Sequence, residues 1–143
     1  LSLEYPMDLT QTFPRSPKEK ALGLVHIPRM IDKSKAYQAQ KLGEYIFPCP
    51  LDDIILKFLE IDCETFAEEA CNREESDFFG WIENSCLSSK IKEKEALNLE
   101  ILQKKPDTEE KRRKFVELRD KVDPSRTDIN TWVDLIDLEE NRL

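Results

Sequence analysis

The sequence predicts an all-α fold: a single compact multi-helix domain of about seven helices with an extended N-terminal arm. Its 143 residues approach the size of one domain. Apolar residues make up 39% and charged residues 36%, which is typical of small helical domains with charged outer faces. Apolar residues recur at helical spacing, most fully at Ile129, Trp132, Val133 and Ile136, and no convincing strand pattern is present.

Residues 1–15 are predicted to form the arm, because prolines at 6 and 14 break any helix. The string Ser16-Pro17-Lys18-Glu19 predicts a helix start, with a serine cap, proline at the first helical position and glutamate third. Gly23 should keep this first helix short. We expect residues 1–143 to form a single helical domain, of which residues 1–15 are the arm.

A second helix is expected over residues 28–41 and is predicted to end at Gly43 through a positive φ. Residues 44–50 contain two prolines and predict an extended crossing segment. Six further helices follow from apolar spacing and capping residues. They are 51–60, 63–71 after Asp62, 77–86 after Ser76, a long helix from Ser88 or Ser89 to before Pro106, one opened by Asp107-Thr108-Glu109-Glu110 and ended by Pro124, and a last helix capped by Thr127 or Asp128.

Composition excludes several classes of protein. The three glycines are too far apart for a phosphate-binding loop, and the single histidine, His26, excludes a zinc site of the two-His kind. No metal site is therefore predicted, and no cofactor can be named. The longest apolar runs are far shorter than the ~20 residues of a membrane span. Met7 is the expected native start.

The net charge of −8 argues against binding of nucleic acid through the whole surface. The basic run Lys111-Arg112-Arg113-Lys114 is surrounded by glutamates, which predicts a solvated helix face. The four cysteines form no C-x-x-C pair. Free, mostly buried thiols and a cytoplasmic location are the expectation. Cys49, held between two prolines, is a candidate reactive thiol, with a buried structural thiol as the alternative.

A basic stretch, Arg15–Lys41, stands out in this acidic chain, with seven Lys or Arg and two acidic residues. Arg29 and Lys33 are four residues apart and share a helix face. Arg15 precedes the predicted helix start, whose free N–H groups also attract anions. The hypothesis is that Arg15, Arg29 and Lys33 line one concave site for a carboxylate or phosphate. The alternative is that Arg29 pairs with Glu44 or Asp32 while Lys33 is solvated.

Two further sets of residues are candidates for chemistry. Asp32 and Glu44, with Tyr45 at the edge of the site, offer a pair of carboxylates for acid–base work. The alternative is charge balance of the nearby cations, with Tyr45 packing its ring. His26 lies between apolar neighbours, which is more typical of a half-buried structural histidine than of a catalytic one.

Several strings occur together in one order. They are Asp8-Leu9-Thr10, Pro14-Arg15-Ser16-Pro17, Pro28-Arg29-Met30-Ile31-Asp32-Lys33, Gly43-Glu44-Tyr45, Cys49-Pro50-Leu51-Asp52, and Arg126-Thr127-Asp128-Ile129 before Trp132 and Asp134. With these strings the chain, from Asp8 to Glu139, resembles a family of small bacterial proteins catalogued as a domain of unknown function. One departure is Leu24, where a second glycine often follows in that family. The resemblance implies a compact bacterial domain and leaves its activity open.

Two classes of function remain. The first is a non-catalytic module that binds a small anion or a partner protein, including a second copy in a homodimer, through residues 14–45. The second is a small enzyme that uses Arg15, Arg29, Asp32 and Glu44 around a pocket. A fitted pocket with both carboxylates and arginines would favour the enzyme, whereas a flat apolar patch near a dimer axis would favour the partner module.

Overall fold

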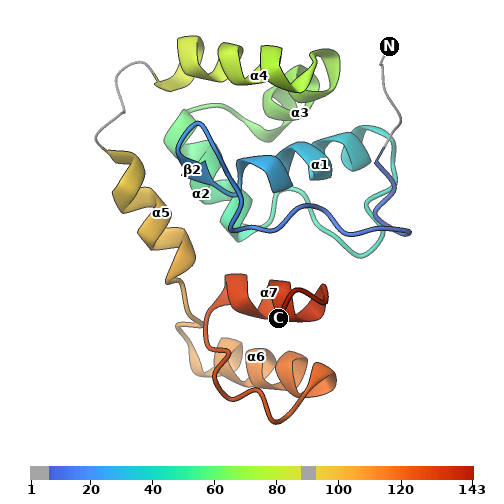
Figure 1. Ribbon diagram of the computed structural model, residues 1–143, viewed down its shortest axis with the longest axis vertical. Helices are drawn as coiled ribbons and strands as arrows, with labels where there is room; N and C mark the ends of the chain where they lie inside the picture. The colour runs from blue at the N-terminus through green and yellow to red at the C-terminus, as the bar shows by residue number, and fades with distance from the viewer. Residues whose placement is uncertain (1–6, 88–92) are drawn as a thin grey trace.

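Seven α-helices and one short hairpin make up the computed structural model of the chain, which describes residues 7–87 and 93–143 (Figure 1). The prediction of an all-α fold with an N-terminal arm is confirmed. In order, the elements are β1 Lys20–Ala21, β2 Leu24–Val25, α1 Ile27–Gln38, α2 Pro50–Leu59, α3 Cys63–Asn72, α4 Glu75–Ile82, a π-helical turn Glu83–Leu87, α5 Lys94–Leu102, α6 Glu109–Val122 and α7 Trp132–Glu139. Within the described residues, no helix has the length and apolar character needed to cross a membrane.

The predicted helix at Ser16 is wrong, because the chain there forms a turn and then β1. The hydroxyl of Ser16 accepts a hydrogen bond from the backbone N–H of Lys18 at 3.1 Å, which closes a tight turn and not a helix. Leu22 and Gly23 both have positive φ, the turn that suits a two-residue hairpin. The hairpin buries β2 completely, and this tertiary burial outweighs the local capping pattern.

Helix α1 begins one residue before Pro28 and ends at Gln38, earlier than predicted. The left-handed residue that follows it is Gln40, with φ 57°, and not Gly43. Gly43 does have a positive φ of 61°, but it lies in the next loop, where a Cβ would come within 3.3 Å of the Leu9 carbonyl oxygen. Its role is therefore close contact with the N-terminal arm. The crossing segment predicted for residues 44–50 has neither helix nor strand until α2 begins.

The capping predictions have mixed outcomes. Asp62 caps α3 by accepting from the backbone N–H of Thr65 at 2.7 Å, as predicted. Ser76 lies inside α4, whose N-cap is Glu74. At α6 the N-cap is Thr108, which accepts from the backbone N–H of Lys111. Because the third helical residue is then Lys111 and not a glutamate, the predicted capping box does not form. Ser88 and Ser89 lie outside the described residues.

The last helix begins later than its apolar pattern predicts. Thr131, and not Thr127 or Asp128, caps α7 by accepting from the backbone N–H of Asp134. Ile129 is 2% exposed but precedes the helix. It is buried from a turn in which Arg126 and Asp128 form an ion pair. An apolar residue at helical spacing can thus join the core without belonging to the helix.

The core has two parts. The larger part is formed by the hairpin, α1 to α5 and Val133, and includes Phe66 packed edge-on against Phe78 with ring centroids 5.0 Å apart. The smaller part lies between α6 and α7 and contains Phe115, Ile129, Leu135 and Leu138. Trp132 is partly buried and packs against both parts.

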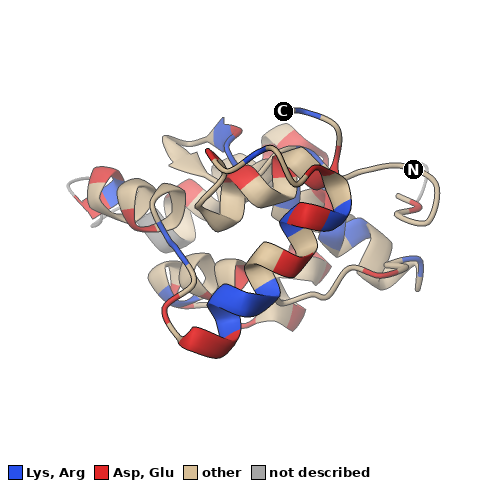
Figure 2. Ribbon diagram, turned by 90° about the horizontal axis from the view of Figure 1, so that it is seen from below, with Lys and Arg blue, Asp and Glu red and all other residues tan. Residues whose placement is uncertain are grey.

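Helix α6 covers the smaller core with one face and exposes the rest. Phe115 is its buried residue, and the predicted solvated face is present. Figure 2, which views the molecule from the side of α6, shows basic and acidic residues mixed along the surface. Lys111 pairs with Asp107 at 3.3 Å and Lys114 with Glu117 at 3.5 Å. The basic run is therefore a mixed-charge surface.

Candidate functional site

The C-terminal end of α7 contacts α1 through a buried ion pair. Arg29 donates from both terminal nitrogens to the Glu140 carboxylate, at 3.0 and 2.8 Å, and both side chains are almost fully buried. The hydroxyl of Tyr45 donates to Glu140 at 2.8 Å, and the Arg29 guanidinium lies 5.5 Å from the Tyr45 ring centroid. Arg142 also forms an ion pair with the Glu140 carboxylate.

A second buried ion pair lies one helical turn further along α1. Lys33 Nζ is 2.6 Å from Asp52 Oδ2, with 3% and 0% of the two side chains exposed. Asp52 also accepts from His26 Nε2 at 2.6 Å and from the backbone N–H of Cys49 at 2.9 Å. The last contact forms part of the capping box at the start of α2. Asp52 thus connects three segments of the chain.

The charge states of this group follow from its contacts. Burial opposes ionisation of Asp52, but the hydrogen bond from His26 and the charge of Lys33 hold its pKa well below its usual range. Burial lowers the pKa of His26 more than Asp52 raises it. His26 is therefore a neutral imidazole that donates its Nε2 proton to Asp52. Its Nδ1 atom is buried without a hydrogen-bond partner among the described residues.

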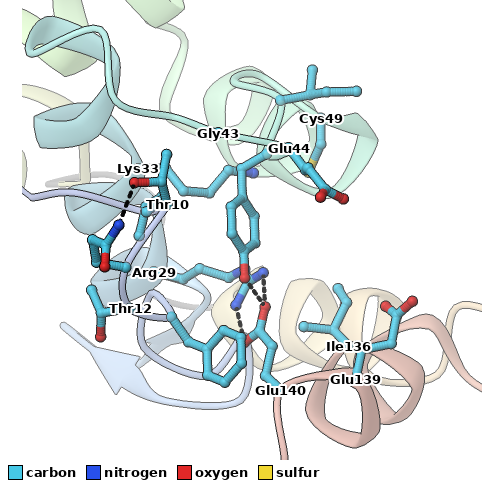
Figure 3. A pocket seen from close by; sticks show the side chains of 15 residues that line it. Thr10, Thr12, Arg29, Lys33, Gly43, Glu44, Cys49, Ile136, Glu139 and Glu140 are labelled. Carbon is cyan, nitrogen blue, oxygen red and sulfur yellow. Dashed lines mark hydrogen bonds and ion pairs between the residues drawn. The ribbon is translucent and has the colours of Figure 1, made fainter. Parts of the chain in front are cut away.

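Both ion pairs lie against a cavity of about 960 Å³ (Figure 3). Four separate segments line it: the arm, α1, the loop before α2, and α7. The lining residues are Leu9, Thr10, Gln11, Thr12, Phe13, Arg29, Lys33, Gly43, Glu44, Tyr45, Ile46, Cys49, Ile136, Glu139 and Glu140. Figure 3 shows the Arg29 side chain hydrogen-bonded to Glu140, which comes from the end of α7. The cavity has the size of a ligand site, for which about 300–1,000 Å³ is typical.

The structure brings some of the predicted site residues together. Four of them line this cavity: Arg29, Lys33, Glu44 and Tyr45. His26 is fully buried and does not line the cavity, but it bonds to Asp52, which pairs with the lining residue Lys33.

Arg15 and Asp32 do not line the cavity. The Arg15 guanidinium bonds to Asp32 at 3.0 Å and to Glu75 at 2.7 Å, and Asp32 also accepts from the Arg15 backbone N–H. The helix N-terminus expected beside Arg15 is not formed. All three cations of the predicted anion site are thus paired with carboxylates of their own. The partners of Arg29 and Lys33 are, however, neither Glu44 nor Asp32.

Sequence reasoning missed the partners that hold the cations. Asp52 carries one local signal, because it is the third residue of α2 in a capping box with Cys49. Glu140 carries none, since it lies 111 positions from Arg29. Residues 9–13 of the arm, which also line the cavity, were not predicted. An irregular extended segment has no hydrophobic periodicity that would indicate which of its side chains face the rest of the domain.

One group of residues has the composition of a metal site. His26, Cys49 and Asp52 place ligand atoms within 4.8 Å of one another. The Lys33 ammonium, 2.6 Å from Asp52, already supplies the cation at this place. Burial and the Asp52 charge also raise the pKa of the Cys49 thiol, so the thiolate that a metal or a nucleophilic reaction needs is disfavoured. The group is best described as a hydrogen-bonded network.

The fold and the cavity define a small helical domain with a pocket whose lining includes Arg29, Lys33 and Glu140, all members of buried ion pairs. The chain belongs to the family described as Domain of unknown function (DUF5069), whose family model matches residues 11–142. The resemblance found in the sequence is thereby confirmed. No curated protein matches the chain.

Proposed function

We propose that this domain binds a small organic ligand in the pocket without transforming it. The observation that carries the proposal is that Arg29 and Lys33, one turn apart on α1, both line the pocket while each forms a buried ion pair, with Glu140 and Asp52 respectively. Buried ion pairs contribute little net stability compared with apolar residues of the same volume. Their position beside a cavity is explained by donors and acceptors that orient a ligand.

The protonation states favour binding over catalysis. A general acid or base works best when its pKa lies near the working pH. The pKa of Asp52 is held far below neutrality. The pKa values of Tyr45 and Cys49 are raised by burial, further by Glu140 at Tyr45 and by Asp52 at Cys49. None of these three groups is therefore poised to exchange a proton near neutral pH.

The pocket extends the segment proposed from sequence. Residues 14–45 supply Arg29, Lys33, Glu44 and Tyr45, whereas residues 9–13 and α7 supply the rest of the walls. A partner protein or a second copy is the rival occupant. Phe13 and Ile46 are 45% and 68% exposed at this pocket, and an apolar side chain of a partner would also cover them.

Native mass spectrometry of freshly purified protein tests the proposal. Thr12→Trp places an indole in the pocket wall, and Thr127→Trp adds the same side chain at an exposed position outside the pocket lining. A retained small molecule should be lost from Thr12→Trp and kept by Thr127→Trp. Identical bound species in both variants, or a dimer with no small molecule in either, would contradict a pocket ligand.

A second candidate is a small enzyme. The observation that favours it is the chain from Lys33 through Asp52 to His26, which links the pocket to the single histidine. An NMR pH titration of the His26 ring tests this. Protonation of the His26 imidazole near neutral pH would support proton exchange along these hydrogen bonds and hence the enzyme. An imidazole that stays neutral well below pH 6.5 would oppose the enzyme.

A bacterial cytoplasm is the compartment that we propose. Cys49 and Cys63 are free thiols in the structure, which suits a reducing environment.

A further inference from the structure

The charges that line the pocket do not balance once the ion pairs are counted. Arg29 and Lys33 are the only basic residues of the lining, and each is neutralised by a buried carboxylate. Two acidic residues of the lining remain, Glu44 and Glu139. Neither has an ion-pair partner in residues 7–87 and 93–143. The lining therefore carries excess negative charge, on two side chains that are exposed to solvent.

Glu44 and Glu139 come from different elements that face the same cavity. Glu44 lies in the loop before α2, and Glu139 lies on the last turn of α7, next to the paired Glu140 (Figure 3). Partial burial and the neighbouring Glu140 charge raise the pKa of Glu139. A cation placed beside Glu139 would offset the repulsion from Glu140, whereas an anion would increase the repulsion.

The remaining walls contain apolar surface beside the polar side chains of Thr10, Gln11 and Thr12. Ile46, Ile136, Leu9 and Phe13 all line the cavity, and Phe13 is 45% exposed there. Apolar surface of this kind fits the body of an organic molecule better than a hydrated inorganic ion.

We infer that the ligand is an organic cation: a protonated amine on an apolar body, with its ammonium group paired to Glu44 and Glu139. This inference rests on the proposed function, because it names the class of ligand for the same pocket. It reverses the charge expected from the basic stretch of the sequence, since the cations of that stretch are already neutralised inside the fold.

Three probes of one shape test the charge of the ligand: benzylamine, benzyl alcohol and benzoate. Each is titrated into the full chain while amide NMR shifts are followed at residues 9–13, 43–46 and 136–140. Benzylammonium should bind about fivefold more tightly than benzyl alcohol, the ratio that ~1 kcal/mol of partly exposed ion pairing gives. Benzoate should bind more weakly than the alcohol, and added salt should reduce the difference.

Matched variants connect the preference to the two carboxylates. The double variant Glu44→Gln with Glu139→Gln should bring benzylamine down to the affinity of benzyl alcohol. Glu110→Gln, at an exposed position on α6, should leave all three affinities unchanged. Benzoate binding at the pocket with equal or higher affinity would overturn the inference and leave the pocket ligand standing. If no probe shifts these amides, both the inference and the proposed function fail.

Discussion

Arg29 and Glu140 lie 111 positions apart and form a two-point ion pair beside the pocket, at 3.0 and 2.8 Å. The contact connects α1 of the larger core to the end of α7, which also borders the smaller core. A hydroxyl bond from Ser16 to Asp137 lies nearby. Residues at the end of α7 thus contact the N-terminal part of the chain through hydrogen bonds and ion pairs.

Removal of the charge of Glu140 should be strongly destabilising. Glu140→Gln leaves the Arg29 guanidinium buried without its carboxylate, and breaking a buried pair from one side costs about 3–5 kcal/mol. Urea denaturation measures the change in the free energy of unfolding. Glu139→Gln is the matched control, because Glu139 is exposed and should change stability by about 0.5 kcal/mol or less. Equal effects of the two variants would show that the buried pair carries no special stability.

His26 should make the fold acid-sensitive below its ordinary pKa. Its pKa is lowered in the folded state by burial, so the unfolded chain binds more protons below pH ~6.5. Stability is therefore full above that pH and falls as the pH drops below it, by at most about 1.4 kcal/mol per pH unit. Denaturation midpoints between pH 7 and 5 check this.

His26→Gln provides the control for that pH dependence. His26 is the only histidine in the chain, so the variant should be less stable overall and lack the fall between pH 6.5 and 5. An unchanged pH profile in the variant would assign the effect to carboxylates. The low pKa of Asp52 acts in a different window, since its contribution is present above about pH 4 and is lost only in stronger acid.

The thiols are expected to be free throughout the chain. Alkylation under denaturing, non-reducing conditions should modify all four cysteines of the chain. Cys49 and Cys63 are free thiols in the structure, and the side chain of Cys86 lies outside the described residues. Recovery of only two modified thiols would remove the main support for a reducing compartment. Mass spectrometry of the alkylated chain provides the measurement.

The sequence predicted the fold class and most helices because their signals are local. The Asp62 cap and the apolar spacing within α2, α3 and α6 depend on residues within a few positions. The hairpin at β1 and β2 was missed because its stability comes from burial under distant helices. Leu24 and Val25 are fully buried, and the carbonyl oxygen of the Asn98 side chain accepts from the backbone N–H of Val25 at 2.9 Å, 73 positions away.

The same difference between local and distant contacts separates the predicted site from the observed one. Helical spacing correctly placed Arg29 and Lys33 one turn apart on α1. It does not reveal which carboxylates neutralise them, because Asp52 and Glu140 arrive from other elements. The net charge of the pocket depends on which carboxylates pair with these cations. Because Glu140 neutralises Arg29 and Asp52 neutralises Lys33, the basic stretch of the sequence does not form a basic site.

Trp132 is predicted to be a major contributor to stability despite incomplete burial. Its helical spacing with Ile129, Val133 and Ile136 predicts a core-facing side chain, and in the structure Trp132 is partly exposed at the first position of α7. It nevertheless contacts both parts of the core and packs edge-on against Phe115, with centroids 5.1 Å apart. Trp132→Ala should therefore cost about 3 kcal/mol, the lower end for large aromatic truncations. Thermal and urea unfolding should show a single shifted transition, and Leu99→Ala, at a residue 51% exposed, is the control. A shift no larger than that of Leu99→Ala would mean that α6 and α7 do not depend on this side chain for their packing onto the larger core.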